Sequence, residues 1–178
     1  MKTRREILQG LIVSIGGASA LAACNGAATV FATKSGSVGR FYTANEMALV
    51  SRISELIIPR TETPGALDAN VPGYLDGLMA DWANEETQQV HRNALQMLQS
   101  QLGDRVNGDF LDVTEAVAES ALTELDAAAF EGDESLRGYR TLKSYVSQAY
   151  FATEDGAIDE LKWVAVPGRW DPAVEIPA

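Results

Sequence analysis

The chain has 178 residues, enough for one domain of ordinary size, and its 46% hydrophobic and 22% charged content is typical of globular proteins. Its formal net charge of −11 argues against nucleic acid and against an anionic membrane surface as electrostatic partners. The single cysteine and the single histidine exclude an intrachain disulfide and leave little material for a metal site.

The first 23 residues have the pattern of an export signal. Arg4 and Arg5 precede an apolar run, residues 11–23, that is as long as a signal h-region and too short for a comfortable membrane span. The order Thr-Arg-Arg-x-Ile-Leu resembles the signal of the twin-arginine route, which carries folded proteins. We therefore expect the twin-arginine translocase to export the chain to the periplasm and residues 1–23 to be cleaved off.

The cleavage site has two interpretations. Leu-Ala-Ala-Cys at 21–24 is similar to a bacterial lipobox, which would make Cys24 the lipidation site and anchor the protein to the membrane as a lipoprotein. The alternative is cleavage by ordinary signal peptidase, with Cys24 incidental. Residues 24–40 are rich in Gly, Ala, Ser and Thr and predict a flexible tether. Residues 41–178 then form a single helical subunit domain.

Apolar residues recur at helical spacing through most of this domain, and no alternation typical of strands rises above noise. Thr43 and Glu46 have the spacing of a capping box at the start of the first helix. Gly103 is the expected C-cap of the third. The first predicted helix spans about 44–58, and the second starts at 70–72 and continues to 82. The other three span about 85–102, 114–130 and 134–153. The predicted fold is all-α: about five helices in a loose bundle with an irregular C-terminal tail, preceded by the signal segment.

Two stretches rich in proline, glycine and arginine interrupt the helical pattern. In the first, 57–66, Pro59 stops a helix and Pro64 stiffens a polar loop. The second, 164–172, has the tryptophan and arginine composition of an interface anchor. The alternative for the first stretch is an ordinary loop. The alternative for the second is a tail that packs on its own helices. The predicted partner-binding residues are Arg60, Thr61, Glu62, Pro64, Pro167, Gly168, Arg169 and Trp170.

A search for catalytic, cofactor-binding or metal-binding patterns yields none. His91 lies in the middle of a predicted helix with no triad pattern, and we expect it to be solvated or half packed. Three aspartates around the second helix are interpreted as solubilising, and four aromatic residues of the last helix as core. These residues are Asp68, Asp76 and Asp81, and Tyr139, Tyr145, Tyr150 and Phe151.

The two interrupting stretches, with Val71-Pro72, a helix carrying Met79 and Trp82, and Glu-Asp-Gly-Ala at 154–157, resemble the gluconate 2-dehydrogenase subunit 3 family. The resemblance covers nearly all of residues 41–171. It implies an all-α accessory subunit of a membrane-associated sugar or polyol dehydrogenase, without a cofactor of its own. FAD would lie in a large flavoprotein of the glucose-methanol-choline (GMC) type, often served by a cytochrome c subunit that carries haem c.

In that family the large subunit typically lacks an export signal, so the small subunit carries it through the twin-arginine pore. We therefore expect a non-catalytic subunit needed for export and for assembly or stability of the flavoprotein. The alternative is a stand-alone periplasmic lipoprotein that binds a small ligand between its helices. An enzyme in its own right would need a polar cluster that only the fold could assemble.

Overall fold

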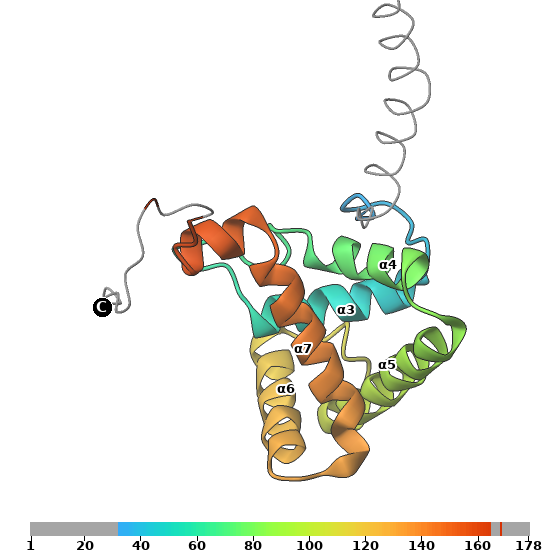
Figure 1. Cartoon of the computed structure of the whole chain (residues 1–178). Helices are drawn as coiled ribbons and strands as arrows, with labels where there is room; N and C mark the ends of the chain where they lie inside the picture. Colours follow the sequence, from blue (N-terminus) through green and yellow to red (C-terminus); the bar gives the residue numbers. More distant parts are fainter. Residues whose placement is uncertain (1–31, 165–167, 169–178) are drawn as a thin grey trace, which may run out of the picture. The chain divides into compact units, whose positions relative to one another are not determined.

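The computed structural model describes residues 32–164 and residue 168 (Figure 1). This part of the chain contains helices and no strand, so the all-α prediction is confirmed. The predicted signal residues Arg4 and Arg5 and the predicted lipidation site Cys24 lie outside the described residues. The elements are α3 (Ala44–Ile57), α4 (Val71–Asp81), α5 (Glu85–Val106), α6 (Glu115–Phe130), the short 3-10 helix η2 (Glu134–Leu136), α7 (Arg137–Phe151) and the π-helical turn η3 (Asp155–Glu160).

Local capping explains where α3 begins and ends. Thr43 Oγ1 accepts a hydrogen bond from the Glu46 amide, and the Glu46 carboxylate accepts one of 2.8 Å from the Thr43 amide, so the predicted capping box is present. The helix ends at Ile57, because Pro59 disfavours the α conformation in the residue before it.

Two predicted boundaries are wrong. Gly103 lies inside α5, which continues to Val106 and ends at Asn107, a residue in the left-handed conformation with φ 52°. Asparagine tolerates this conformation better than most residues, so it can cap the helix in place of glycine. The predicted helix 134–153 is divided into η2 and α7, because the Asp133 carboxylate accepts the Ser135 amide and starts a tighter turn.

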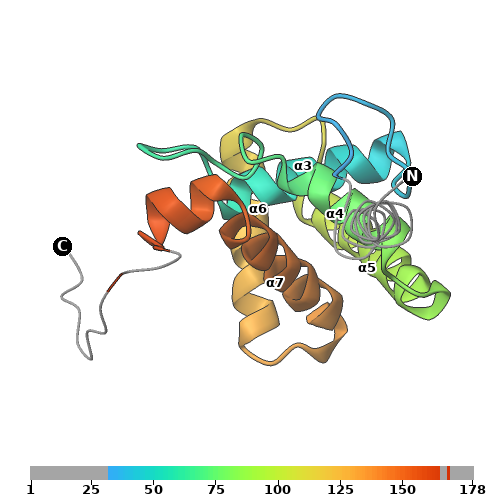
Figure 2. The same cartoon turned by 45° about the horizontal axis from the view of Figure 1, so that its top comes forward.

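The last long helix, α7, organises the core. It contacts α3, α4, α5 and α6, and Figures 1 and 2 show it crossing the other helices. Each burial of a leucine, isoleucine or methionine side chain stabilises the fold by about 2 kcal/mol before entropy is counted. The largest fully buried side chains are Tyr42, Leu49, Ile53, Leu75, Met79, Leu95, Leu98, Leu102, Phe110, Leu125, Tyr139 and Tyr150.

Asp76 is buried, so its interpretation as a solubilising residue is wrong. Its carboxylate accepts hydrogen bonds from the amides of Arg40, Phe41 and Tyr42, at 2.8, 3.0 and 2.7 Å, and from the Thr33 hydroxyl. Burial opposes ionisation of Asp76, but these hydrogen bonds outweigh it and hold the pKa of the carboxyl below its ordinary value. Asp76 therefore attaches the segment before α3 to α4.

The predicted flexible tether, residues 24–40, is too long at its C-terminal end, because Thr33 is also attached to α4 and to the residue before it. The Thr33 amide donates to the Gly73 carbonyl at 2.8 Å, and the Asn70 side chain donates to the Thr33 carbonyl at 3.0 Å. A Cβ atom on Gly73 would lie 2.0 Å from the Thr33 carbonyl oxygen, so the close approach requires glycine. Residues 33–40 thus belong to the folded domain, and composition alone did not reveal their partners on α4.

Side chains also hold the connections between the later helices. The Arg52 guanidinium donates to the carbonyls of Leu111 and Val113, at 2.7 and 2.5 Å, and so fixes the loop before α6. Lys143 and Tyr139 of α7 both bond Asp126 of α6, at 2.5 and 2.7 Å. Within residues 32–164, no helix has the length and apolar character needed to cross a membrane.

Candidate partner-binding surface

The polar loop of residues 58–66 is joined to the end of α7 and to η3. The Tyr150 hydroxyl donates a hydrogen bond of 2.7 Å to the Pro64 carbonyl, and the Thr63 hydroxyl donates to the Glu160 carboxylate. Figures 1 and 2 show η3 beside the connection between α3 and α4. The first interrupting motif therefore lies against the segment that leads into the second.

The loop is also closed on itself. The Ala66 amide donates to the Ile58 carbonyl at 2.9 Å, and the Gly65 amide donates to the Asp68 carboxylate at 2.9 Å. A Cβ on Gly65 would lie 2.6 Å from the Arg60 amide nitrogen, so the two backbone segments approach too closely for any other residue. These contacts give the loop a defined shape before any partner is bound.

The predicted residues of this loop divide into exposed and positioning groups. Arg60, Thr61 and Glu62 are exposed, and the Arg60 guanidinium forms an ion pair of 3.3 Å with Asp68. Pro64 is half-buried, and its carbonyl accepts from Tyr150. Pro64 therefore positions the loop, while the three exposed residues remain available for contact.

The second motif, 164–172, is described at two residues, Val164 and Gly168. Gly168 is exposed and has a φ of +71°, a value that favours glycine. Pro167, Arg169 and Trp170 lie outside the described residues, so their predicted role stays a prediction.

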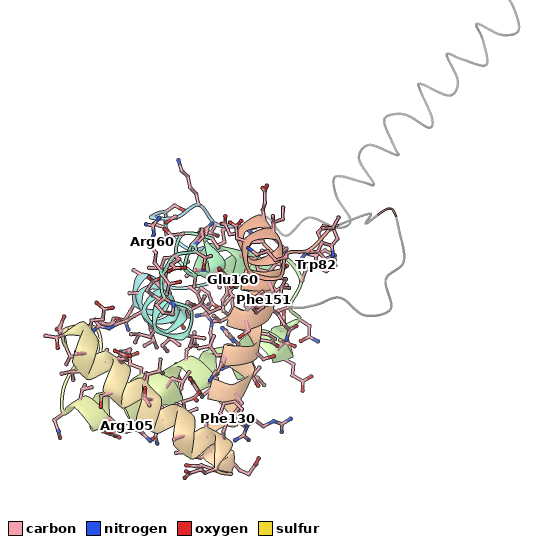
Figure 3. The ribbon with its side chains drawn as sticks, turned by 90° about the vertical axis from the view of Figure 1, so that its left-hand side faces the viewer. Arg60, Trp82, Arg105, Phe130, Phe151 and Glu160 are labelled. Atoms are coloured by element: carbon pink, nitrogen blue, oxygen red, sulfur yellow. The ribbon has the colours of Figure 1, made fainter. Side chains whose placement is uncertain are left out.

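Exposed apolar side chains gather along the end of α7, η3 and the residues that follow. Phe151, Ile158, Leu161, Trp163 and Val164 are 41%, 47%, 58%, 59% and 62% exposed. In Figure 3, Arg60, Glu160 and Phe151 lie above Arg105 and Phe130. We call residues 60–63 together with these five apolar residues the docking surface.

Sequence reasoning missed most of the apolar part of this surface. It placed Phe151 in the core, and that prediction is wrong, whereas Tyr139 and Tyr150 are buried as expected and Tyr145 is half-buried. Helical periodicity could not identify these residues, because η3 is a π-helical turn that ends at Glu160 and Leu161 and Val164 follow it. Their exposure became visible only in the folded chain.

The docking surface has an acidic border. Glu62, Glu154, Asp155, Asp159 and Glu160 outnumber the basic residues Arg60 and Lys162 in these segments. Burial raises the pKa of the Tyr150 hydroxyl, and the charges of Glu160, Asp155 and Asp159 raise it further. An apolar patch with this border presents a negative potential to a partner.

His91 is buried, 5% exposed, so the expectation of a solvated or half-packed side chain is wrong. Its Nε2 lies 2.6 Å from the Tyr42 hydroxyl oxygen, and burial lowers the imidazole pKa to about 4. Beside it, Arg92 pairs with Glu46 at 2.8 Å and lies over the Phe41 ring at 4.1 Å. Among the described residues, no group of three His, Cys, Asp or Glu side chains is placed to hold a metal ion.

A helical domain with a braced polar loop and an exposed, acid-bordered apolar surface has the features of a subunit that acts by binding another protein. The chain belongs to the gluconate 2-dehydrogenase subunit 3 family, whose model matches residues 44–168. The matched region contains the whole loop 58–66 and extends to Gly168. The resemblance inferred from the motifs is thereby confirmed, and the family is that of a subunit of a dehydrogenase complex. No curated protein and no solved structure matched the chain.

Proposed function

We propose that this chain is the non-catalytic small subunit of a periplasmic FAD-dependent sugar or polyol dehydrogenase. In this proposal it binds a large GMC-type flavoprotein through the docking surface and supports twin-arginine export and assembly of that flavoprotein. One observation carries the proposal. Hydrogen bonds of Tyr150 and Thr63 attach the loop 58–66 to α7 and η3, and the end of α7, η3 and the residues that follow expose apolar side chains.

The docking surface has the composition of an interface core. Burial of apolar area in an interface contributes about 25 cal/mol per Å², of which only the surplus over ordering costs appears as affinity. Tryptophan is enriched among the residues that contribute most to such interfaces, and Trp163 is 59% exposed. A loop that is already held in one shape loses less conformational freedom on binding.

The acidic border favours a partner whose contact surface is positively charged. A complementary surface on the flavoprotein would carry lysine or arginine around an apolar centre. Attraction between exposed charges is screened within about 8 Å at physiological ionic strength, so added salt should slow association.

The proposal assigns the redox chemistry to other chains. FAD would be held by the flavoprotein, and haem c by a cytochrome c subunit where one is present. Lipidation at Cys24 would keep the assembly at the membrane. The small subunit would contribute the export signal, the docking surface and the stability of the bound flavoprotein.

An export experiment tests this function. A GMC-type flavoprotein from the same genome is produced with the wild-type chain, with the R4K/R5K variant, or alone, and periplasmic and cytoplasmic fractions are assayed for flavin and for both proteins. We expect periplasmic flavoprotein with the wild-type chain only. A flavoprotein that reaches the periplasm equally well without the small subunit would contradict the export role.

A further inference from the structure

A groove of about 530 Å³ lies between α5 and the start of α7. This volume is in the range of small-molecule sites. We propose that the groove binds a small monocarboxylate with an apolar body, such as a medium-chain fatty acid. The residues that carry the argument are Val90, His91, Ala94, Met97, Arg137 and Tyr145.

One wall of the groove is apolar. Val90 is 63% exposed, and Ala94 and Met97 continue the same side of α5 at positions four and seven residues later. Gly138 of α7 packs against Ala94, because an added Cβ would lie 2.7 Å from the Ala94 Cβ, so the two helices touch at this point beside the groove. This wall suits a hydrocarbon chain or a ring.

The groove also contains the ring of a neutral histidine. Tyr42 Oη has no other hydrogen-bond partner among the described residues, so its proton is satisfied only if it donates to His91 Nε2. The reverse arrangement would leave a buried hydroxyl proton unpaired, at a cost of about 1–3 kcal/mol. His91 Nδ1 therefore carries the ring proton as a hydrogen-bond donor.

The Nδ1 donor is left open to a ligand. It has no protein acceptor in the described part of the chain. The only buried side-chain nitrogen or oxygen without a partner in that part is Ser54 Oγ, so Nδ1 is accessible rather than buried, and His91 lines the groove. A ligand acceptor atom would complete the hydrogen bonding of the ring.

Two further groups favour an anionic acceptor. Arg137 lines the groove and forms no ion pair or hydrogen bond through its guanidinium with any described residue. Tyr145 also lines it, with its ring 6.2 Å from that of His91, and its hydroxyl has no partner among the residues described. A guanidinium with two neutral donors is suited to a carboxylate, and the apolar wall to the rest of the molecule.

The groove is separate from the docking surface. Its α7 residues belong to the first nine positions of that helix, 137–145, whereas the docking surface includes only the last residue of α7, Phe151. None of the docking-surface residues lines the groove. The inference therefore stands on different residues from those of the proposed function.

Because His91 is the single histidine of the chain, it is a specific spectroscopic probe. The exported protein, with a tag free of histidine, is labelled with ¹⁵N-histidine and titrated with octanoate at pH 7, with octanamide as the uncharged comparison. We expect a free protein with the proton on Nδ1, and a saturable shift of the Nδ1 resonance with octanoate at least about tenfold tighter than with octanamide.

The Val90→Asp variant introduces a negative charge at an exposed position of the apolar wall, so it should weaken octanoate binding about tenfold or more without unfolding the protein. The matched control is Val117→Asp, at a 45% exposed valine of α6 that does not line the groove, and it should bind as the wild type does. An unshifted Nδ1 resonance, equal affinity for octanamide, or equal weakening in both variants would overturn the proposal.

Discussion

Tyr150 and Pro64 are 86 positions apart in the sequence and are joined by a hydrogen bond of 2.7 Å from the tyrosine hydroxyl to the proline carbonyl. Tyr150 is buried near the end of α7, and Pro64 stands in the middle of the polar loop after α3. The bond makes one surface from two distant segments. Its strength should therefore affect both the stability of the fold and the binding of a partner.

Replacing Tyr150 by phenylalanine should lower the free energy of unfolding by about 1–2 kcal/mol, because the Pro64 carbonyl loses its donor. Urea unfolding of both proteins measures the difference. The control is Tyr74→Phe in α4, whose hydroxyl has no hydrogen-bond partner among the described residues, and it should change stability by less than about 0.5 kcal/mol. Equal effects of the two substitutions would show that the hydrogen bond from Tyr150 does not stabilise the loop.

Replacing Leu161 by aspartate should weaken binding of the flavoprotein about tenfold or more, because a charge enters the apolar part of the docking surface. Since Leu161 is 58% exposed, the variant should fold normally. Surface plasmon resonance against the purified flavoprotein measures the affinity, and Val117→Asp on α6 is the matched control. Unchanged affinity in the Leu161→Asp variant would place the interface elsewhere.

The second predicted motif has its own test. Replacing Arg169 and Trp170 together by alanine should release the flavoprotein while the helical circular dichroism of the small subunit stays unchanged. Retention of the flavoprotein by this double variant would remove these two residues from the partner-binding site.

Replacing Asp76 by asparagine should destabilise the protein by about 2–4 kcal/mol, because the amides of residues 40–42 lose a charged acceptor. The folded pKa of Asp76 lies below the ordinary 3.8, so its contribution is complete above that pH and is lost as the pH falls through the folded pKa. The exposed Asp112→Asn change is the control and should have little effect in urea unfolding. A stability equal to that of the control would contradict the account of Asp76.

Burial of His91 should make the stability of the protein depend on pH in a different range. Its folded pKa of about 4 lies below the ordinary 6.5, so the unfolded chain binds more protons between these values and stability falls as the pH drops from 6.5 to 4. This contribution reaches about 3 kcal/mol. In His91→Gln, which keeps an acceptor for Tyr42, this part of the pH dependence should disappear. Parallel pH profiles of the two proteins would show that His91 is not buried as a neutral ring.

Local rules predicted the parts of the fold that depend on neighbouring residues. The capping box at Thr43 and Glu46 and the stop at Pro59 rest on contacts within four residues, and helical periodicity identified the helices. The roles of Asp76 and His91 depend on partners 34 to 49 positions away, which periodicity does not report. The polar loop was recognised from its prolines, but its attachment to Tyr150 became visible only in the folded chain.

Purification of the tagged chain with its partner tests the central proposal most directly. The protein is recovered under gentle conditions from periplasmic and membrane fractions of its own cells, and the absorption spectrum and composition of the eluate are measured. We expect a flavin band and a co-purifying chain of flavoprotein size. A colourless protein recovered alone would contradict the subunit proposal and favour a stand-alone ligand-binding lipoprotein.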